Sequence, residues 1–311
     1  DDAEACLRRF QPCKMNRPVK LGNDITLTFT GVGHILGAAA VNLQIDEGHK
    51  TQRLCYTGDI GHNKHKIIKA PENYLPADYI ITESTYGDRL HDENVNADES
   101  LLQIVLKTCV EKRGKLIIPA FSVGRTQEIV YALDRFSSQG LLPAIPVYVD
   151  SPLSTNATEI IRNHPELYNK EVIDYLKKDD DPFCFNRLKY IRETADSIAL
   201  NDSREPCIII SASGMMEAGR VVHHLKNNLA NSKNTVLIVG YCAPNTLGHI
   251  LKNGAQVVNI YGESIFCPWR LQGHDRLPDP TTRFPCSKSI FGTRRRRSDA
   301  QLCVQALRYR L

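Results

Sequence analysis

Three segments of the sequence place metal-binding side chains at the ends of predicted strands. His34 lies between glycines in residues 33–38, Asp59 follows a short apolar run, and Glu83 follows another. Imidazole and carboxylate groups are common ligands of hydrolytic metals, and a catalytic zinc needs three protein ligands and an open position for water. His34 and Asp59 supply two ligands. The segments therefore predict metal-dependent hydrolysis, and they indicate that this chain holds only part of the ligand set.

Each of these side chains also has a structural interpretation. His34 could close a turn through a hydrogen bond, and Asp59 could cap the segment that follows it. Glu83 would need a partner if it were buried, and it could orient a histidine instead of binding a metal. His62 and His65 are spaced like ligands on one helix face, but the polar residues between them favour a solvated turn.

A second group of residues could bind phosphate. Residues 119–125 leave a predicted strand and enter a helix, with Ser122 as the expected N-cap, and residues 211–214 end another strand before a helix. A helix N-terminus offers free N–H groups to an anion, and a nearby arginine adds paired donors. Small residues also occur at such turns in any doubly wound sheet, which is the structural alternative. The candidate phosphate-binding residues are Ser122, Arg125, Ser213, Gly214, Arg220, His223 and His224.

The elements that position these residues change in kind near residue 94. In the first part of the chain, alternating residues or short apolar runs predict strands at 25–29, 41–45, 54–56 and 79–81. Residues 46–48 have the composition of a hairpin turn. This alternation indicates an antiparallel or mixed sheet with one buried face.

Beyond residue 94, predicted helices alternate with continuous apolar strands. This alternation is typical of a parallel sheet covered by helices, so the expected fold class is α/β. Strands are expected at 115–120, 146–149, 207–210 and 236–239. Helices are expected at about 95–113 and 123–136, in two pieces up to 176, and at about 217–229. Residues 246–251 and 257–260 are expected to continue the pattern.

Composition separates the end of the chain from the rest. The 311-residue chain has a net charge of +4, but residues 264–311 hold ten Lys and Arg against three Asp and Glu, so the remainder is mildly acidic. An acidic body gives no support to non-specific binding of nucleic acid. Together with the change in pattern near residue 94, this predicts one domain at 1–92, a second domain at 93–263, and a poorly ordered basic tail at 264–311.

The ten cysteines include no Cys-x-x-Cys pair, which argues against a thiolate zinc site and a disulfide framework and indicates a reducing compartment. No apolar run approaches the length of a membrane span, and the acidic start does not resemble a secretory signal. The chain begins without methionine, within a segment of helical character, and we expect it to be a fragment.

The order of six motifs, GHILGA, TGDI, ESTYG, PAFSVGRTQE, SGMMEAGRVVHHL and GYCAPNTLG, resembles the metallo-β-lactamase-fold nucleases that carry a β-CASP insert. That family includes ribonuclease J, the pre-mRNA 3′-end processing endonuclease and many prokaryotic RNA-processing hydrolases. The resemblance covers roughly residues 5–263. ESTYG and SGMMEAGR are its most specific motifs.

The resemblance implies that the first domain is a partial lactamase αβ/βα sandwich and the second a β-CASP domain, with two Zn²⁺ ions between them that cleave RNA with a metal-bound hydroxide. It places His34 on the third metal motif and Asp59 on the fourth, where the carboxylate bridges both metals. It places Glu83 on the first β-CASP motif, which hydrogen-bonds a catalytic histidine. Two cations lower the pKa of a bound water and stabilise charge on the attacked phosphate.

The sequence departs from that family at both ends. The His-x-His-x-Asp-His motif, which supplies four ligands, does not occur, and His274 does not match the two later histidine motifs. We therefore expect a truncated chain that binds zinc poorly and is inactive by itself. The composition change near residue 264 suggests a frame-shifted or wrongly spliced end.

The residues are compatible with three functions. The first is a zinc-dependent ribonuclease, seen as an incomplete chain, and the second is a non-catalytic RNA-binding or scaffold subunit of the same family. The retained His34, Asp59 and Glu83 favour the first. The third, an unrelated nucleotide-binding enzyme, lacks a Gly-x-Gly-x-x-Gly or Walker lysine motif. The expected partners are RNA or single-stranded DNA and a second copy or related subunit, with no membrane. The expected location is the cytoplasm, or the nucleus in a eukaryote.

Overall fold

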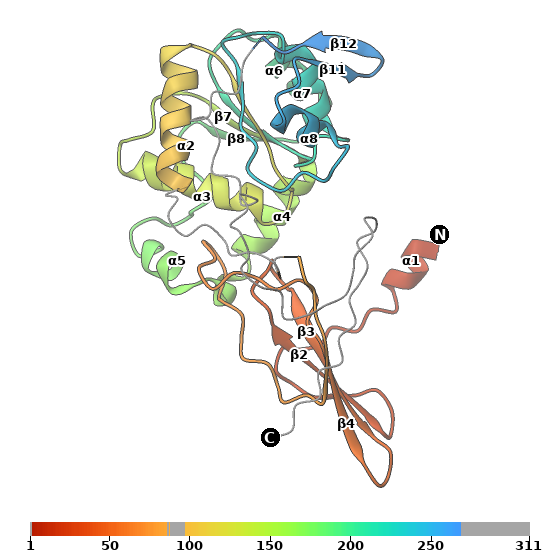
Figure 1. Ribbon diagram of the computed structural model, residues 1–311. Coiled ribbons are helices and arrows are strands. Elements are labelled where there is room, and N and C mark those ends of the chain that lie inside the picture. Colours follow the sequence, from red (N-terminus) through yellow and green to blue (C-terminus); the bar gives the residue numbers. More distant parts are fainter. Residues whose placement is uncertain (1, 86, 88–96, 269–311) are drawn as a thin grey trace, which may run out of the picture. The chain divides into compact units, whose positions relative to one another are not determined.

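The computed structural model describes residues 2–85, 87 and 97–268, and it divides the chain into two compact units at residues 90 and 91 (Figure 1). We call the part at 2–87 the N-terminal unit and the part at 97–268 the C-terminal unit. Within the described residues, no helix has the length and apolar character needed to cross a bilayer.

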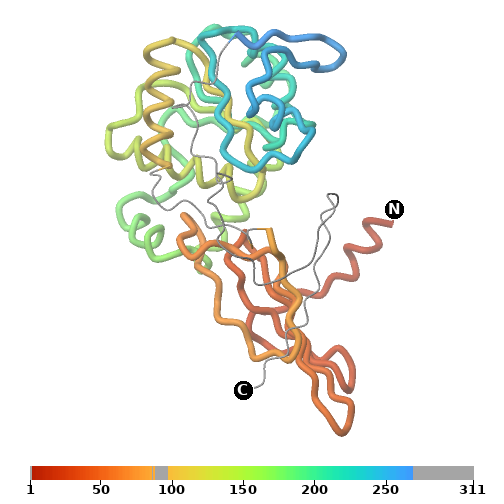
Figure 2. Tube along the Cα trace, in the orientation of Figure 1, coloured from red at the N-terminus to blue at the C-terminus, as the bar shows by residue number. Residues whose placement is uncertain are grey.

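The N-terminal unit is built on a mixed five-stranded sheet. Its strands run in the order β1-β2-β3-β4-β5, antiparallel except for the parallel pair β4 and β5. Figure 2 traces β2, β3 and β4 side by side, and residues 47–50 form the expected turn between β3 and β4. The four expected strands are confirmed. The elements are α1 (Asp2–Leu7), β1 (Val19–Lys20), β2 (Ile25–Gly31), β3 (Ala39–Asp46), β4 (Thr51–Tyr56) and β5 (Tyr79–Ile81).

The buried side chains of this sheet are small or polar. Ala40 and Cys55 are at most 1% exposed. Asn42 is 8% exposed, and its buried Nδ2 donates to the Thr28 carbonyl and the Thr30 hydroxyl. The larger apolar side chains of the alternating pattern lie on the other face and are half-buried or exposed. Side chains therefore alternate between the two faces of the sheet as expected, but the face with the large apolar side chains is less buried than the other.

The C-terminal unit has an all-parallel sheet in the order β10-β6-β9-β7-β8. Helices α2, α3 and α4 form one group and α6, α7 and α8 another (Figure 1). The α/β fold class is confirmed. The elements are α2 (Ala97–Val105) with a π-helical continuation (Leu106–Glu111), β6 (Leu116–Pro119), α3 (Arg125–Ser138), β7 (Val147–Asp150), α4 (Pro152–Arg162), a 3-10 turn (Pro165–Leu167), α5 (Lys170–Tyr175), β8 (Leu188–Ile191), α6 (Thr194–Asp202), β9 (Ile208–Ser211), α7 (Arg220–Asn228), β10 (Thr235–Val236), α8 (Leu247–Lys252), β11 (Val257–Ile260) and β12 (Glu263–Phe266).

The core of the C-terminal unit lies along its central strands. Every residue of β6 and β9 is buried, as expected of strands that have helices on both faces. The register pairs Pro119 of β6 with Ser211 of β9, and Ser211 with Asp150 of β7. The carboxyl ends of three central strands are therefore level, so the turns that follow them lie close together.

Five features of this unit differ from the sequence expectation. The strand β8 and the helix α6 were not predicted, and β10 has two residues instead of four. Residues 257–260 do not continue the parallel sheet, because β11 pairs with β12 in a separate antiparallel hairpin whose turn, Tyr261-Gly262, has positive φ at both residues. Since β12 includes Ser264–Phe266, regular structure continues past the expected start of the tail at 264. The rest of that tail, residues 269–311, lies outside the described residues.

Candidate functional site

His34 and Asp59 lie together at one end of the N-terminal sheet. The His34 Nε2 atom is 3.9 Å from Asp59 Oδ2, and their side chains are 45% and 74% exposed. Gly33 and Gly58 turn the chain with φ of +61° and +60°. Gly33 cannot be replaced without strain, because a Cβ atom there would lie 2.7 Å from the Lys69 carbonyl oxygen. The structure therefore brings together the two predicted ligands, 25 residues apart in sequence, with both groups open to solvent.

Glu83 supports the segment that carries Asp59. Its Oε1 atom accepts a hydrogen bond from the Ile60 amide at 2.6 Å, and its Oε2 atom accepts one from the Thr85 hydroxyl at 2.8 Å. The Thr57 amide also donates to the Ile81 carbonyl, so the strand-end segments are joined at two points. The described contacts of Glu83 are thus to a loop amide and a hydroxyl. The capping interpretation of Asp59 fails because no helix begins at residues 60–65.

His62 and His65 belong to a turn. The Nδ1 atom of His62 accepts from the Lys64 amide, and that of His65 accepts from the amides of Ile67 and Ile68. Within residues 2–85, 87 and 97–268, no group of three or more His, Cys, Asp or Glu is placed to hold a metal ion. The donor pair His34 and Asp59 does not by itself fit a dinuclear zinc centre, which needs further ligands at each metal.

The two predicted phosphate turns of the C-terminal unit meet at the ends of β6, β7 and β9. The Ser122 hydroxyl lies 3.5 Å from the hydroxyl of Ser151, which follows β7. The Phe121 ring packs against Gly214, where a Cβ atom would lie 3.3 Å from two ring carbons. Gly214 is therefore needed for close packing against Phe121, and Ser122 follows the carboxyl end of β6. No hydrogen bond of the Ser213 hydroxyl was found among the described residues.

Ser122 is not the N-cap of α3, contrary to the sequence expectation. The N-cap is Gly124, with a φ of +86°, and its amide donates to Gln127 Oε1 at 2.8 Å. The Gln127 side chain is fully buried, and its Nε2 donates to the Ser122 carbonyl and the Thr158 hydroxyl. Ser122 is thus held by its backbone carbonyl, and its hydroxyl contacts that of Ser151. Arg125, the first residue of α3, pairs with Glu128 at 2.6 Å and is 46% exposed.

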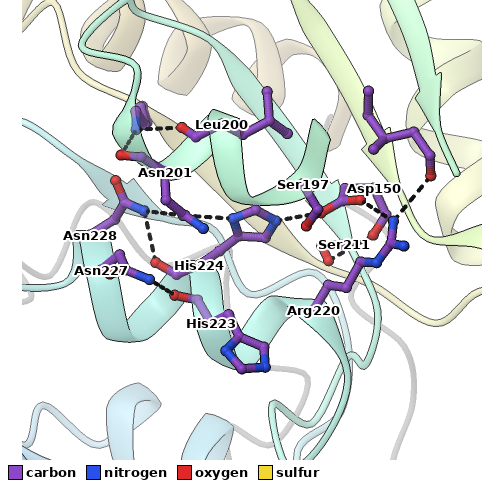
Figure 3. Close-up of polar contacts among 12 residues, drawn as sticks. Asp150, Ser197, Leu200, Asn201, Ser211, Arg220, His223, His224, Asn227 and Asn228 are labelled. Atoms are coloured by element: carbon purple, nitrogen blue, oxygen red, sulfur yellow. Dashed lines mark hydrogen bonds and ion pairs between the residues drawn. The ribbon is translucent and has the colours of Figure 1, made fainter. Parts of the chain in front are cut away.

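Asp150, the last residue of β7, is the centre of a hydrogen-bond network (Figure 3). Asp150 and His224 are both fully buried. Arg220 Nη1 is 2.7 Å from Asp150 Oδ1, His224 Nε2 is 2.6 Å from Asp150 Oδ2, and the Ser197 hydroxyl also donates to Oδ2. Burial alone would raise the pKa of the Asp150 carboxyl, but the hydrogen bonds from His224, Ser197 and Arg220 outweigh it and hold that pKa below its ordinary value. Asp150 is therefore an ionised carboxylate.

Both ring nitrogens of His224 have polar partners. Asn228 Nδ2 donates to the His224 carbonyl oxygen, which fixes the orientation of that amide, and it also donates to Asn201 Oδ1. Asn201 thus presents its oxygen to His224 Nδ1 at 2.9 Å, and Asp150 Oδ2 lies 2.6 Å from His224 Nε2. The His224 ring therefore bridges Asp150 of β7 and Asn201 of α6.

These contacts change the assignment of three predicted phosphate ligands. His224 has no exposed surface, and Arg220 donates to Asp150 and to the Ile191 and Arg192 carbonyls. The expectation that these two residues bind phosphate is therefore wrong. His223 points away from Asp150 (Figure 3) and is exposed, with its Nε2 3.3 Å from the Tyr261 hydroxyl. The structure thus separates adjacent histidines into one buried and one surface group.

Sequence reasoning missed four members of the network. Asp150, Ser197, Asn201 and Ser211 were not singled out, although Asp150 directly follows an apolar strand and precedes a Ser-Pro helix start, which is a signal for a carboxylate at a strand end. Ser197 and Asn201 carried no signal because α6 was not predicted.

Comparisons with known proteins bear on the same parts of the chain. A β-CASP domain matches residues 126–251. Ribonuclease TTHA0252 of Thermus thermophilus is 32% identical over 274 residues, covering 88% of this chain and 61% of that protein. Transcription termination factor FttA of Methanocaldococcus jannaschii is 34% identical, covering 83% of this chain and 41% of the factor. An RNase J-like protein of the same organism is 31% identical, covering 85% and 60%. The chain therefore spans 41 to 61% of the length of these relatives.

Proposed function

Because this chain belongs to the β-CASP family, we propose that it forms the RNA-binding portion and part of the catalytic site of an RNA-processing phosphodiester hydrolase. Two relatives carry ribonuclease names and another is a transcription termination factor, and all of these names concern RNA or its synthesis. The observation that carries the proposal is the meeting of His34, Asp59 and Glu83 at one end of the N-terminal sheet.

In the proposed function, the turns of the C-terminal unit bind RNA phosphates. Ser122 and Ser213 present hydroxyls at the carboxyl ends of β6 and β9, where ligands of open α/β sheets bind. Arg125 is exposed enough to turn from Glu128 toward a phosphate, and His223 adds a donor at the surface. Since no base-specific group is implied, we expect single-stranded RNA to bind through its backbone, with an affinity that falls as salt is raised.

In the N-terminal unit, we propose that Asp59 and His34 contact the reacting phosphate or a metal, and that Glu83 positions Asp59 through the Ile60 amide. We also propose that RNA cleavage at the complete site depends on zinc. Since the described donors do not complete a zinc centre, the 311-residue chain should retain zinc weakly and cleave RNA poorly. The incomplete donor set also favours a second candidate function, a non-catalytic RNA-binding subunit. We place either form in the cytoplasm, or in the nucleus of a eukaryote.

Two measurements on the purified chain test the proposal. Fluorescence anisotropy with a labelled single-stranded RNA should show saturable binding, weakened by Ser213→Ala and by Arg125→Ala. A matched substitution far from the turns, Ser203→Ala, should leave the affinity unchanged. Failure to bind RNA or single-stranded DNA would refute the RNA function.

Metal analysis, with RNA cleavage measured alongside, tests the incomplete site. We expect substoichiometric zinc and little cleavage after zinc is added. Stoichiometric zinc with chelator-sensitive cleavage that Asp59→Asn abolishes would support the hydrolase and overturn the statement that this chain lacks ligands. RNA binding without zinc or cleavage would favour the subunit function.

A further inference from the structure

The buried carboxylate of Asp150 receives donors from two helices. Arg220 and His224 belong to α7, and Ser197 belongs to α6, so one side chain at the end of β7 ties both helices to the sheet. The contact with Arg220 is an ion pair in which the carboxylate is fully buried and the guanidinium is 20% exposed. Removing one partner of such a pair is strongly destabilising, so the Asp150 carboxylate stabilises the positions of both helices.

The position of α7 in turn sets the Ser213-Gly214 turn. The Val221 amide donates to the Ala212 carbonyl, and the Ser213 amide donates to the Ala218 carbonyl. Gly219, the N-cap of α7, has a φ of +83° and approaches so closely that a Cβ atom would lie 2.6 Å from the Ala212 oxygen. The turn and the first residues of α7 are therefore one packed unit.

Asp150 also acts on the other side of the turns through its backbone. Its carbonyl oxygen accepts from the Ser211 hydroxyl at 2.9 Å, two residues before Ser213. The next residue is Ser151, whose hydroxyl caps α4 by accepting from the Ser154 amide and lies 3.5 Å from the Ser122 hydroxyl. Ser122 is thus linked to Asp150 through Ser151, and Ser213 is linked to Asp150 through Ser211.

We propose that Asp150, with its buried partner His224, is a positioning residue that fixes Ser122 and Ser213 in the arrangement that binds RNA phosphate. This inference rests on the proposed function and deepens it. Neither Asp150 nor His224 touches RNA, since both are fully buried. Their role is to hold the strand-end hydroxyls in register before RNA arrives, so that little ordering is required on binding.

Ser197→Ala is the sharpest test, because it removes one neutral donor from Asp150 and leaves its contacts with Arg220 and His224. Ser197 is 6% exposed and cannot contact RNA itself. Loss of one hydrogen bond to a charged group should weaken RNA binding about threefold to tenfold at most. Ser203→Ala, at the exposed C-cap of the same helix, is the matched control and should bind as the wild type does. Asp150→Asn should weaken binding more than Ser197→Ala, provided that it folds.

Hydrogen exchange separates positioning from general loss of stability. In folded Ser197→Ala, amides at 211–216 should exchange faster than in the wild type, while those of α2 should be unchanged. Equal RNA affinity of wild type and Ser197→Ala, or unchanged exchange at 211–216 in Ser197→Ala, would overturn the proposal. A wild type that binds no RNA would instead refute the function on which it rests.

Discussion

Asp134 should make the folded protein less stable as the pH rises, and replacing it with asparagine should remove that effect. Asp134 lies on α3 and is 1% exposed. Its Oδ2 atom accepts from the Tyr175 hydroxyl at 2.7 Å, whereas its Oδ1 atom has no hydrogen-bond partner among the described residues. Burial, the largest cause, together with the nearby Asp179 and Asp181 raises the pKa of Asp134 from 3.8 to about 6, despite the tyrosine hydrogen bond.

The sign and size of the effect follow from this raised pKa. The folded state keeps a proton that the unfolded chain releases near pH 3.8, so stability is greatest below that pH and falls as the pH rises to about 6. A difference of about 2 pKa units corresponds to ~3 kcal/mol at most, and relaxation or water entry should reduce it to about 2 kcal/mol. Above about pH 7 the loss should be complete and constant.

Urea denaturation at a series of pH values from 4 to 8 measures the effect. Asp134→Asn mimics the protonated acid, so it should match the wild type near pH 4 and exceed its unfolding free energy by about 2 kcal/mol at pH 8. Asp180→Asn changes the same charge at an exposed position and serves as the control. If Asp134→Asn destabilises the protein at pH 8, or leaves the pH slope unchanged, the burial argument for Asp134 is wrong.

Substitutions at three further positions test the packing around the candidate sites. Asp150→Asn should lower the unfolding free energy by about 3–5 kcal/mol, because it leaves the Arg220 guanidinium without its buried counter-charge; urea denaturation at pH 7 measures this loss. Gly61→Ala should cost about 1–3 kcal/mol, because its Cβ would lie 1.8 Å from the Gly33 carbonyl oxygen, and a melting temperature equal to the wild type would contradict that contact. Glu83→Ala should speed hydrogen exchange of the Ile60 amide, whereas Glu83→Gln should retain most of the protection, because it keeps an acceptor oxygen.

The sequence predicted the elements whose pattern is strong and local. The continuous apolar runs of β6 and β9 and the alternation of β2 and β3 required no knowledge of their neighbours. The helix α6 was missed because its sequence, TADSIALND, has weak amphipathic character and no side-chain cap. The strand β11 was found but assigned to the wrong sheet, since a short strand does not reveal its partner.

The residues of the candidate sites were likewise predicted where their signal is local and missed where it depends on distant residues. His34, Asp59 and Glu83 were identified because each stands at the end of a strand next to a recognisable motif. Asp150 was missed because its importance comes from Ser197 and His224, which lie 47 and 74 residues away in sequence. His224 was taken for a surface ligand because sequence alone does not tell which of two adjacent helix residues faces the core.

Crosslinking of bound RNA, read by mass spectrometry, tests the central claim most directly. A photoreactive single-stranded RNA is bound to the purified 311-residue chain, irradiated, and the attached peptides are identified. The account predicts crosslinks in residues 121–125 and 213–216, at the ends of β6 and β9, and their loss when unlabelled RNA competes. Crosslinks that leave both segments unmodified while RNA is bound would contradict the assignment of the phosphate site.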